Sequence, residues 1–182
     1  MKFIPTDLAG VIIIEPVRHG DARGYFCETF RRSDFEKAVG AVDFVQENES
    51  MSRRGVLRGL HYQSGASAQA KLVRVSRGSI VDVAVDLRRS SPTFGRHIAV
   101  ELSAANGRQL FVPRGFAHGF AVLEDDTVFQ YKVDNYYDPS SERSVSPFDP
   151  ALGIAWPFGA DEAIVSDKDA FAPMLCEAEL FE

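Results

Sequence analysis

The stretch Gly55–Gln63 places a guanidinium and an imidazole on one apolar, strand-like segment. Its glycines at 55 and 59 suggest a buried strand that another backbone or a ligand approaches closely. In such a strand His61 is either a core residue with a satisfied hydrogen bond or a positioned acid or base. Arg58 and His61 are three residues apart, so a regular strand would point them to opposite faces. If both serve one ligand, Gly59 must mark a bulge or bend, or Arg58 must reach the pocket from a barrel rim.

Three further side chains suit proton transfer or charge stabilisation. His118 lies among glycines and aromatics in Phe111–Phe120, which is typical of a tight barrel corner or of a pocket histidine. Tyr131 alternates with Phe129 and is expected to face inward, as a structural residue or as a proton donor. Lys71 opens an apolar strand, so its ammonium group either meets a partner or ligand or extends outward at the barrel rim.

The histidines do not form a metal-binding pattern. Small barrels that bind metal usually place two histidines as H-x-H with a carboxylate soon after, and no H-x-H occurs among His19, His61, His97 and His118. His97 is expected on a solvated strand face and His19 in a surface turn. The sequence therefore predicts no metal site.

Four cations are candidates for anion recognition in an otherwise acidic chain. Arg23, Arg58, Lys71 and Lys168 could converge on an anion, for which arginine offers bidentate geometry. The pair Tyr136-Tyr137 at a strand end is either a platform on which a base stacks or the edge of the core, and residue type alone favours the core.

Composition limits the class of protein. A chain of 182 residues with 45% hydrophobic content is expected to form one domain, residues 1–182. The net charge of −6 argues against a nucleic-acid or anionic-membrane surface, and the early apolar run Val11–Ile14 is too short to span a membrane. Cys27 and Cys176 fit no disulfide or metal spacing, which favours a reducing cytoplasm.

From Phe44 onward the pattern is almost entirely short strands separated by turn signals. They are expected at residues 44–48, 56–63, 72–76, 80–87, 98–102, 109–112, 119–123 and 128–133. This pattern predicts an all-β barrel or jelly roll with a few short peripheral helices. The strands joined through Arg77-Gly78-Ser79 have the clearest hairpin signature. In the second of them, Asp82 and Asp86 are expected to face mostly solvent.

Few regular elements are expected elsewhere. Short strands are predicted over residues 11–16 and 25–30. The capping box Ser33-Asp34-Phe35-Glu36 predicts a helix over residues 34–39. Near the end of the chain, Ser166-Asp167 could cap a second short helix.

Short motifs occur in a fixed order along most of the chain. They are Gly20–Gly24, Phe44–Asn48, Val56–Gln63, Lys71–Arg74, Ser91–Gly95, Phe111–Phe120, Tyr131-Lys132, Asn135–Tyr137 and Ser166–Asp169. Together they resemble the dTDP-4-dehydrorhamnose 3,5-epimerase family of the cupin superfamily. The resemblance implies a cupin-type jelly roll, a metal-free homodimer without a cofactor, and a dTDP-4-keto-6-deoxyhexose substrate.

The chemistry of that family gives each polar pocket residue a role. A ketone at C4 acidifies the protons on C3 and C5, so a base can form an enolate, and protonation of the opposite face inverts the carbon. By resemblance, His61 is the base, Asp169 orients it, and Tyr131 is the acid across the sugar ring. Lys71 would stabilise the enolate charge.

The resemblance also implies the substrate-binding residues. The nucleotide and phosphate contacts map onto Arg23, Glu28, Gln46, Asn48, Arg58, Glu142 and Lys168. His118 matches a position beside the sugar, and Tyr136 is the expected thymine platform, with Tyr137 as the alternative. In a dimer some of these residues could reach into the neighbour's site.

The function implied is inversion at both C3 and C5, giving dTDP-4-dehydro-L-rhamnose for L-rhamnose biosynthesis. An enzyme that inverts only C3 or C5 for another deoxysugar pathway would retain the same base. A non-catalytic barrel that binds sugar nucleotides and a metal-dependent barrel enzyme are the other readings.

Overall fold

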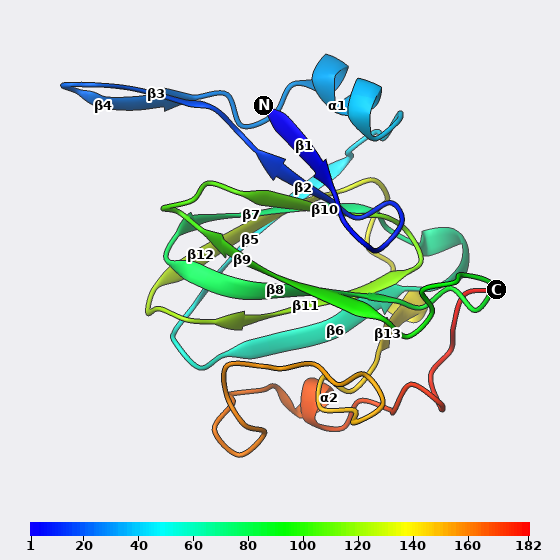
Figure 1. Ribbon diagram of the computed structural model, residues 1–182. Coiled ribbons are helices and arrows are strands. Elements are labelled where there is room, and N and C mark those ends of the chain that lie inside the picture. Colours follow the sequence, from blue (N-terminus) through cyan, green and yellow to red (C-terminus); the bar gives the residue numbers. More distant parts are fainter.

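The computed structural model describes residues 1–182 and consists mainly of two facing β-sheets (Figure 1). The six-stranded sheet has the order β1 (Lys2–Pro5), β2 (Ile12–Glu15), β10 (Gln109–Val112), β7 (Lys71–Arg77), β12 (Thr127–Val133) and β5 (Gln46–Ser52). The five-stranded sheet has the order β13 (Glu142–Ser144), β6 (Leu57–Gln63), β11 (Phe116–Val122), β8 (Ser79–Asp86) and β9 (His97–Ser103). The predicted all-β jelly-roll class is confirmed, and each predicted strand from residue 44 onward has a counterpart.

The predicted hairpin through Arg77-Gly78-Ser79 is wrong, because β7 and β8 belong to different sheets. β7 pairs with β10 and β12, whereas β8 pairs with β9 and β11. Gly78 has φ +77°, and a Cβ there would lie 2.1 Å from Oγ1 of Thr127. The turn therefore passes from one sheet to the other through a space that only glycine fits.

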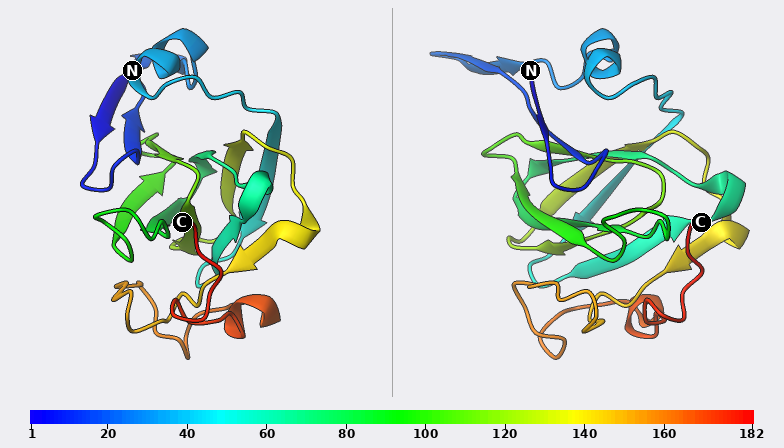
Figure 2. Two further views of the ribbon diagram at one scale, coloured as in Figure 1. Left: turned by 90° about the vertical axis from the view of Figure 1, so that its right-hand side faces the viewer. Right: turned by 45° about the vertical axis from the view of Figure 1, so that its right-hand side comes forward.

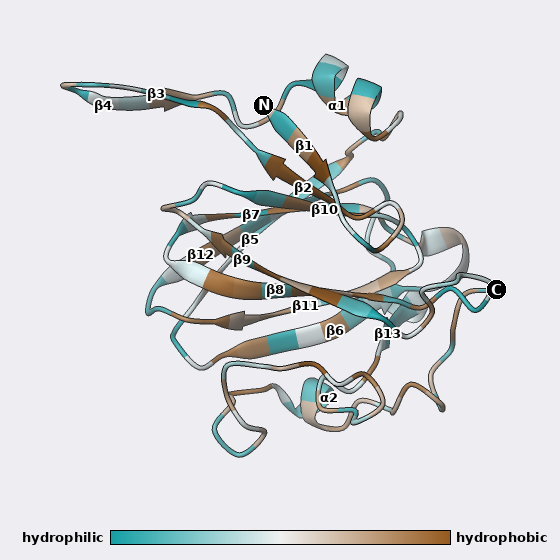
Figure 3. Ribbon diagram, in the orientation of Figure 1, coloured by the Kyte–Doolittle hydropathy of each residue, from teal (hydrophilic) through white to brown (hydrophobic).

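The largest hydrophobic cluster fills the space between the sheets. It includes Val73 of β7, Ile80 of β8, Phe120 of β11 and Phe129 of β12. β2 is mainly brown in Figure 3, since three of its four residues are isoleucines, and its Ile13 packs against this cluster. A barrel filled in this way is a packed core and not an open pore.

A second cluster covers the outer face of the five-stranded sheet. Val83 and Val85 of β8 pack there with Leu152 and with Ala178 near the C-terminus. Figure 2 shows the C-terminal segment, orange to red, lying along this side of the molecule. The valine face of β8 is thus buried by the end of the chain, and the opposite face lies inside the barrel.

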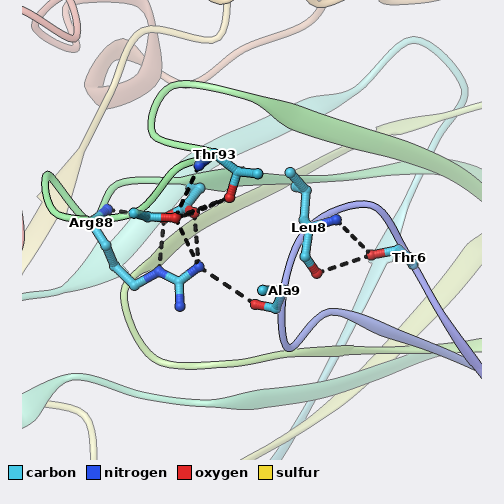
Figure 4. Close-up of polar contacts among 7 residues, drawn as sticks. Thr6, Leu8, Ala9, Arg88 and Thr93 are labelled. Carbon is cyan, nitrogen blue, oxygen red and sulfur yellow. Dashed lines mark hydrogen bonds and ion pairs between the residues drawn. The ribbon is translucent and has the colours of Figure 1, made fainter.

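The expectation that Asp82 and Asp86 face solvent is therefore wrong, since both are 0% exposed. Asp86 accepts hydrogen bonds from Arg88, Ser91 and Thr93. Burial alone would raise the pKa of Asp86, but these hydrogen bonds lower it to about 2. In Figure 4 Arg88 also points to the carbonyl of Ala9, 3.5 Å away, which ties the end of β8 to the turn before β2.

The helices are few and peripheral. α1 (Arg32–Ala38) begins before the predicted capping box, its N-cap Arg31 makes no side-chain cap, and Ser33 lies within the helix. Instead of a side-chain cap, packing of the buried Phe35 against neighbouring aromatic rings stabilises α1. Single 3₁₀ turns occur at η1 (Gly65–Ser67) and η2 (Pro139–Ser141). No helix is long and apolar enough to cross a membrane.

A separate hairpin of β3 (Arg18–Asp21) and β4 (Gly24–Cys27) projects away from the barrel (Figure 1). Only Arg18 at its base is tied to the barrel, through hydrogen bonds to the carbonyls of Ala104 and Ala105. Tyr25 and Phe26 near its tip are largely exposed. We call this hairpin, residues 18–27, the arm.

Candidate active site

A cavity of about 250 Å³ lies between the two sheets. Its walls come from β5, β6, β7, β11, β12 and the segment around α2 (Asp167–Ala170). The lining residues are Glu49, Ser50, Arg58, His61, Lys71, His118, Gly119, Phe120, Phe129, Tyr131, Ser166 and Asp169. All four residues expected to react, which are His61, Lys71, Tyr131 and Asp169, line this one cavity.

His61 and Asp169 form a directly hydrogen-bonded pair. Nε2 of His61 lies 2.5 Å from Oδ1 of Asp169, which is buried although His61 is partly open to the cavity. Burial alone would raise the pKa of Asp169, but the hydrogen bond and charge of His61 hold it below its usual value. Ser166, as expected, caps α2 by accepting a hydrogen bond from the Asp169 amide, which fixes the carboxylate at the imidazole.

The bend expected at Gly59 is present. Gly59 has φ +113°, and the pairing of β6 with β11 shifts register between His118 and Phe120. A Cβ on Gly59 would lie 2.6 Å from the Cα of Gly119, so the close backbone approach predicted from the glycines is confirmed. The shift brings Arg58 and His61 to the same cavity despite their odd spacing.

Tyr131 faces the cavity from the opposite sheet. It lies on β12, whereas His61 lies on β6 of the five-stranded sheet. Burial raises the pKa of the Tyr131 hydroxyl, although a hydrogen bond with Asn48 on β5 opposes the effect. The phenol therefore stays protonated at neutral pH and can donate to a ligand held between the sheets.

Lys71 begins β7, next to β12 on the wall that carries Tyr131. Burial lowers the pKa of Lys71 from 10.5 to about 8, although the carboxylates of Asp82 and Glu142 oppose this change. Its Nζ lies 3.5 Å from the carbonyl oxygen of His61. Lys71 thus extends into the cavity, and the expectation that it could extend outward at the rim is not met.

His118 is a cavity residue held by a second carboxylate. Its Nε2 lies 2.9 and 3.0 Å from the two carboxylate oxygens of Asp82, and both side chains are buried. Sequence reasoning missed Asp82, although an aspartate within an otherwise apolar strand is the signal that could have found it. No group of three or more His, Cys, Asp or Glu side chains is placed to hold a metal ion.

Arg58 reaches the cavity wall and is held by Ser52. Its Nε and Nη2 lie 3.3 and 3.1 Å from the Ser52 hydroxyl, so the guanidinium does not point simply to solvent. Gln46 and Asn48 lie nearby on β5 and bond to each other at 2.9 Å without lining the cavity. Of the four cations expected to converge, Arg58 and Lys71 meet here.

Four other expected ligand-binding residues lie outside the cavity. Lys168 forms an ion pair with Glu142, and the hydroxyl of Tyr137 donates to the same carboxylate at 2.9 Å. Tyr136, which precedes Tyr137 in the chain, is exposed. Lys168, Glu142 and Tyr137 form a polar cluster next to β6, where β13 brings Glu142 opposite Gln63.

Arg23 and Glu28 do not meet the cavity of their own chain. Arg23 lies on the turn of the arm, 89% exposed, with Asp21 as its ion-pair partner. Glu28 follows the arm and pairs with Arg31 at 2.8 Å. Sequence reasoning also did not select Glu49, Ser50, Phe120 and Phe129, which line the cavity. Phe129 follows from its inward alternation with Tyr131 on β12, whereas Glu49 and Ser50 are adjacent on β5, so alternation cannot direct both inward.

Fold and cavity together define a cupin-type jelly roll whose cavity is suited to acid–base chemistry, with a hydrogen-bonded histidine–aspartate pair facing a tyrosine on the opposite sheet. The family model for dTDP-4-dehydrorhamnose 3,5-epimerase matches residues 5–177. The chain is 51% identical to the dTDP-4-dehydrorhamnose 3,5-epimerase of Salmonella typhimurium over the full length of both proteins. It belongs to the dTDP-4-dehydrorhamnose 3,5-epimerase family.

Solved structures agree with this assignment. A dTDP-6-deoxy-D-glucose-3,5-epimerase from Legionella pneumophila in complex with dTDP-4-keto-L-rhamnose is 46% identical, with a TM-score of 0.95, covering 100% of this chain and 97% of that one. The 3′-monoepimerase ChmJ of Streptomyces bikiniensis in complex with dTDP-quinovose is 40% identical, with a TM-score of 0.89, covering 95% of this chain and 87% of that one. Both enzymes share the fold, although their names differ in the number of centres inverted.

Proposed function

We propose that the protein inverts C3 and C5 of dTDP-4-dehydro-6-deoxy-D-glucose, giving dTDP-4-dehydro-L-rhamnose for L-rhamnose biosynthesis. The observation that carries this proposal is the position of His61 and Tyr131 on facing sheets across one cavity. Inversion requires that a proton leave one face of the sugar and that another arrive on the opposite face. A base and an acid on opposite walls meet that requirement with the ring between them.

The contacts of His61 assign its two nitrogens. A proton on Nε2 directed at Asp169 leaves the lone pair on Nδ1 for the C–H bond at C3 or C5. When Nδ1 takes the proton, the bonding electrons pass to the C4 oxygen as an enolate. Asp169 then stabilises the imidazolium, and it also fixes the ring during the transfer.

Lys71 and Tyr131 complete the reaction. The ammonium group of Lys71 lies on the tyrosine wall of the cavity, where it stabilises negative charge on the C4 oxygen. Tyr131 gives its proton to the carbon from the face opposite His61, which restores the ketone. Solvent then reprotonates the phenolate and takes the proton from His61, so no net proton is gained or lost.

The nucleotide binds outside the sugar cavity. Arg58 on the cavity wall supplies a guanidinium for the diphosphate. The exposed ring of Tyr136 is available to thymine, and the cluster of Tyr137, Glu142 and Lys168 offers polar groups for the rest of the nucleotide. His118 contacts the sugar from the wall opposite Lys71.

The protein works as a cytoplasmic homodimer of single-domain subunits. The arm carries Arg23 and exposes Tyr25 and Phe26, which supports its insertion at the site of a second subunit. Mixing an Arg23→Ala variant with a His61→Asn variant tests this arrangement. If the arm serves the partner, the mixed dimers regain one intact site, whereas activity that stays at the level of the separate variants would contradict the exchange.

Deuterium exchange tests the proposed reaction. The keto-sugar nucleotide, incubated with the enzyme in D₂O, should gain label at both C3 and C5, and addition of a 4-keto reductase should yield dTDP-L-rhamnose. The similarity to ChmJ supports one alternative, an enzyme that inverts a single carbon. Label at only one of the two carbons would establish that alternative and exclude the double epimerase.

A further inference from the structure

One wall of the cavity is apolar. Among the side chains that line it, only Phe120 and Phe129 have no polar atom. Their rings stack with centroids 4.2 Å apart and planes 28° from parallel. They are 5% and 3% exposed and belong to the hydrophobic cluster between the sheets. This apolar wall is therefore the place where the cavity meets the hydrophobic cluster between the sheets.

This wall offers a ligand no hydrogen bond. The ring of His118 stacks over Phe129 at 6.0 Å, while its Nε2 is engaged by Asp82. Tyr131 lies beside Phe129 at 5.6 Å between ring centroids. A hydroxyl group placed against Phe120 and Phe129 would lose its water without gaining a partner, and an alkyl group there would be favoured.

The proposed reaction determines which part of the sugar lies nearest this wall. C3 and C5 must each lie between His61 and Tyr131 to exchange a proton, so the hydroxyl on C3 and the C6 group on C5 both lie within one bond of that axis. Phe129 is two residues from Tyr131 on the same inward face of β12. The methyl group at C6 is the only wholly apolar substituent of a 4-keto-6-deoxyhexose.

We propose that Phe120 and Phe129 form the subsite for the C6 methyl group and select 6-deoxy sugars over 6-hydroxy sugars. The inference rests on the proposed function of the cavity. C3 and C5 are the two ring neighbours of C4. When the C6 methyl group on C5 contacts the aromatic wall, the hydroxyl at C3 therefore lies on the other side of C4 and faces the polar side of the cavity. The aromatic wall thereby determines both the orientation in which the sugar ring binds and which sugars bind.

Binding of two unreactive sugar nucleotides tests the subsite. dTDP-6-deoxyglucose and dTDP-glucose differ only by the oxygen on C6, and neither has the ketone that the reaction needs. An apolar pocket rejects an added hydroxyl by up to about 100-fold, so dTDP-glucose should bind roughly 10- to 100-fold more weakly by calorimetry. Phe120→Leu and Phe129→Leu should narrow this gap, since the space left by the ring admits a water molecule to the hydroxyl.

Phe116→Leu is the matched control. Phe116 is buried in the same cluster on β11 but does not line the cavity, so this variant should keep the wild-type gap. Equal wild-type affinities for the two nucleotides, or a gap that Phe116→Leu narrows as much as the wall variants do, would overturn the subsite. Deuterium exchange by the wild type is measured in parallel. Loss of exchange with a retained gap would refute the reaction and support the wall as a binding preference.

Discussion

Raising the pH should remove the enolate-stabilising charge of Lys71 while the rest of the site stays intact. Burial lowers the pKa of this ammonium group from 10.5 to about 8, which makes the proton roughly 300-fold easier to remove than in water. The group is charged below about pH 8 and neutral above it. We therefore expect kcat/KM, which reports the free enzyme, to fall about tenfold for each pH unit above about 8.

Two substitutions isolate this effect. Lys71→Arg keeps a cation at every accessible pH, so its residual activity should stay level where the wild type declines. Lys71→Met should lose on the order of 10²- to 10³-fold in kcat at all pH values but keep its affinity for dTDP. Burial raises the pKa of Tyr131, so this residue does not produce the decline near pH 8.

The assay is deuterium incorporation at C3 and C5, followed by NMR in D₂O buffers from about pH 6 to 10. An alkaline decline that persists unchanged in Lys71→Arg would refute the assignment. So would a wild-type profile that is flat through this range.

Three further predictions concern packing, stability and metals. Gly59→Ala should lower Tm and abolish turnover, because the added Cβ would lie 2.6 Å from the Cα of Gly119. Gly40→Ala is the control: Gly40 has a similar φ of +109° but no atom within 4 Å of an added Cβ, so this variant should show only backbone strain of about 1–3 kcal/mol. Equal losses of stability in the two variants would contradict the close-packing argument. Because the pKa of Asp86 falls from 3.8 to about 2 on folding, its carboxylate should contribute about 2 kcal/mol above about pH 4, lost as the pH falls through about 2. Asp86→Asn should remove that part of the acid dependence of urea unfolding, and an unchanged dependence would speak against it. Exhaustive chelation should leave full epimerase activity, and a loss that added divalent metal restores would show a metal requirement.

The local sequence pattern was sufficient to predict the strands and part of the candidate active site. Alternation in β12 directed Tyr131 and Phe129 inward, and the pairing of that strand confirms it. The spacing of Arg58 and His61 predicted either a bulge or bend at Gly59 or an Arg58 that reaches the pocket from the barrel rim, because side chains three apart on a regular strand cannot share a face, and the bend is present. Both inferences depend only on neighbouring residues, which is why the sequence carries them.

Long-range strand pairing determined the features that the sequence pattern could not predict. Alternation separates the two faces of β8 but does not say which one the C-terminal segment covers, so Asp82 was expected in solvent and lies buried against His118. The glycine turn at Gly78 has the local signature of a hairpin, although its strands join different sheets. The position of Arg23, outside the cavity of its own chain, likewise depends on the path of the arm.

The central claim is that His61 and Tyr131 act on the same carbon from opposite walls. The most direct measurement is deuterium incorporation and configuration at C5 in His61→Asn and Tyr131→Phe, each checked for dTDP affinity. His61→Asn should incorporate no label. Tyr131→Phe should gain label with retention of configuration, because the base exchanges its proton with solvent and returns it to the same face. Inversion that continues in Tyr131→Phe, or exchange that persists in His61→Asn, would contradict the account.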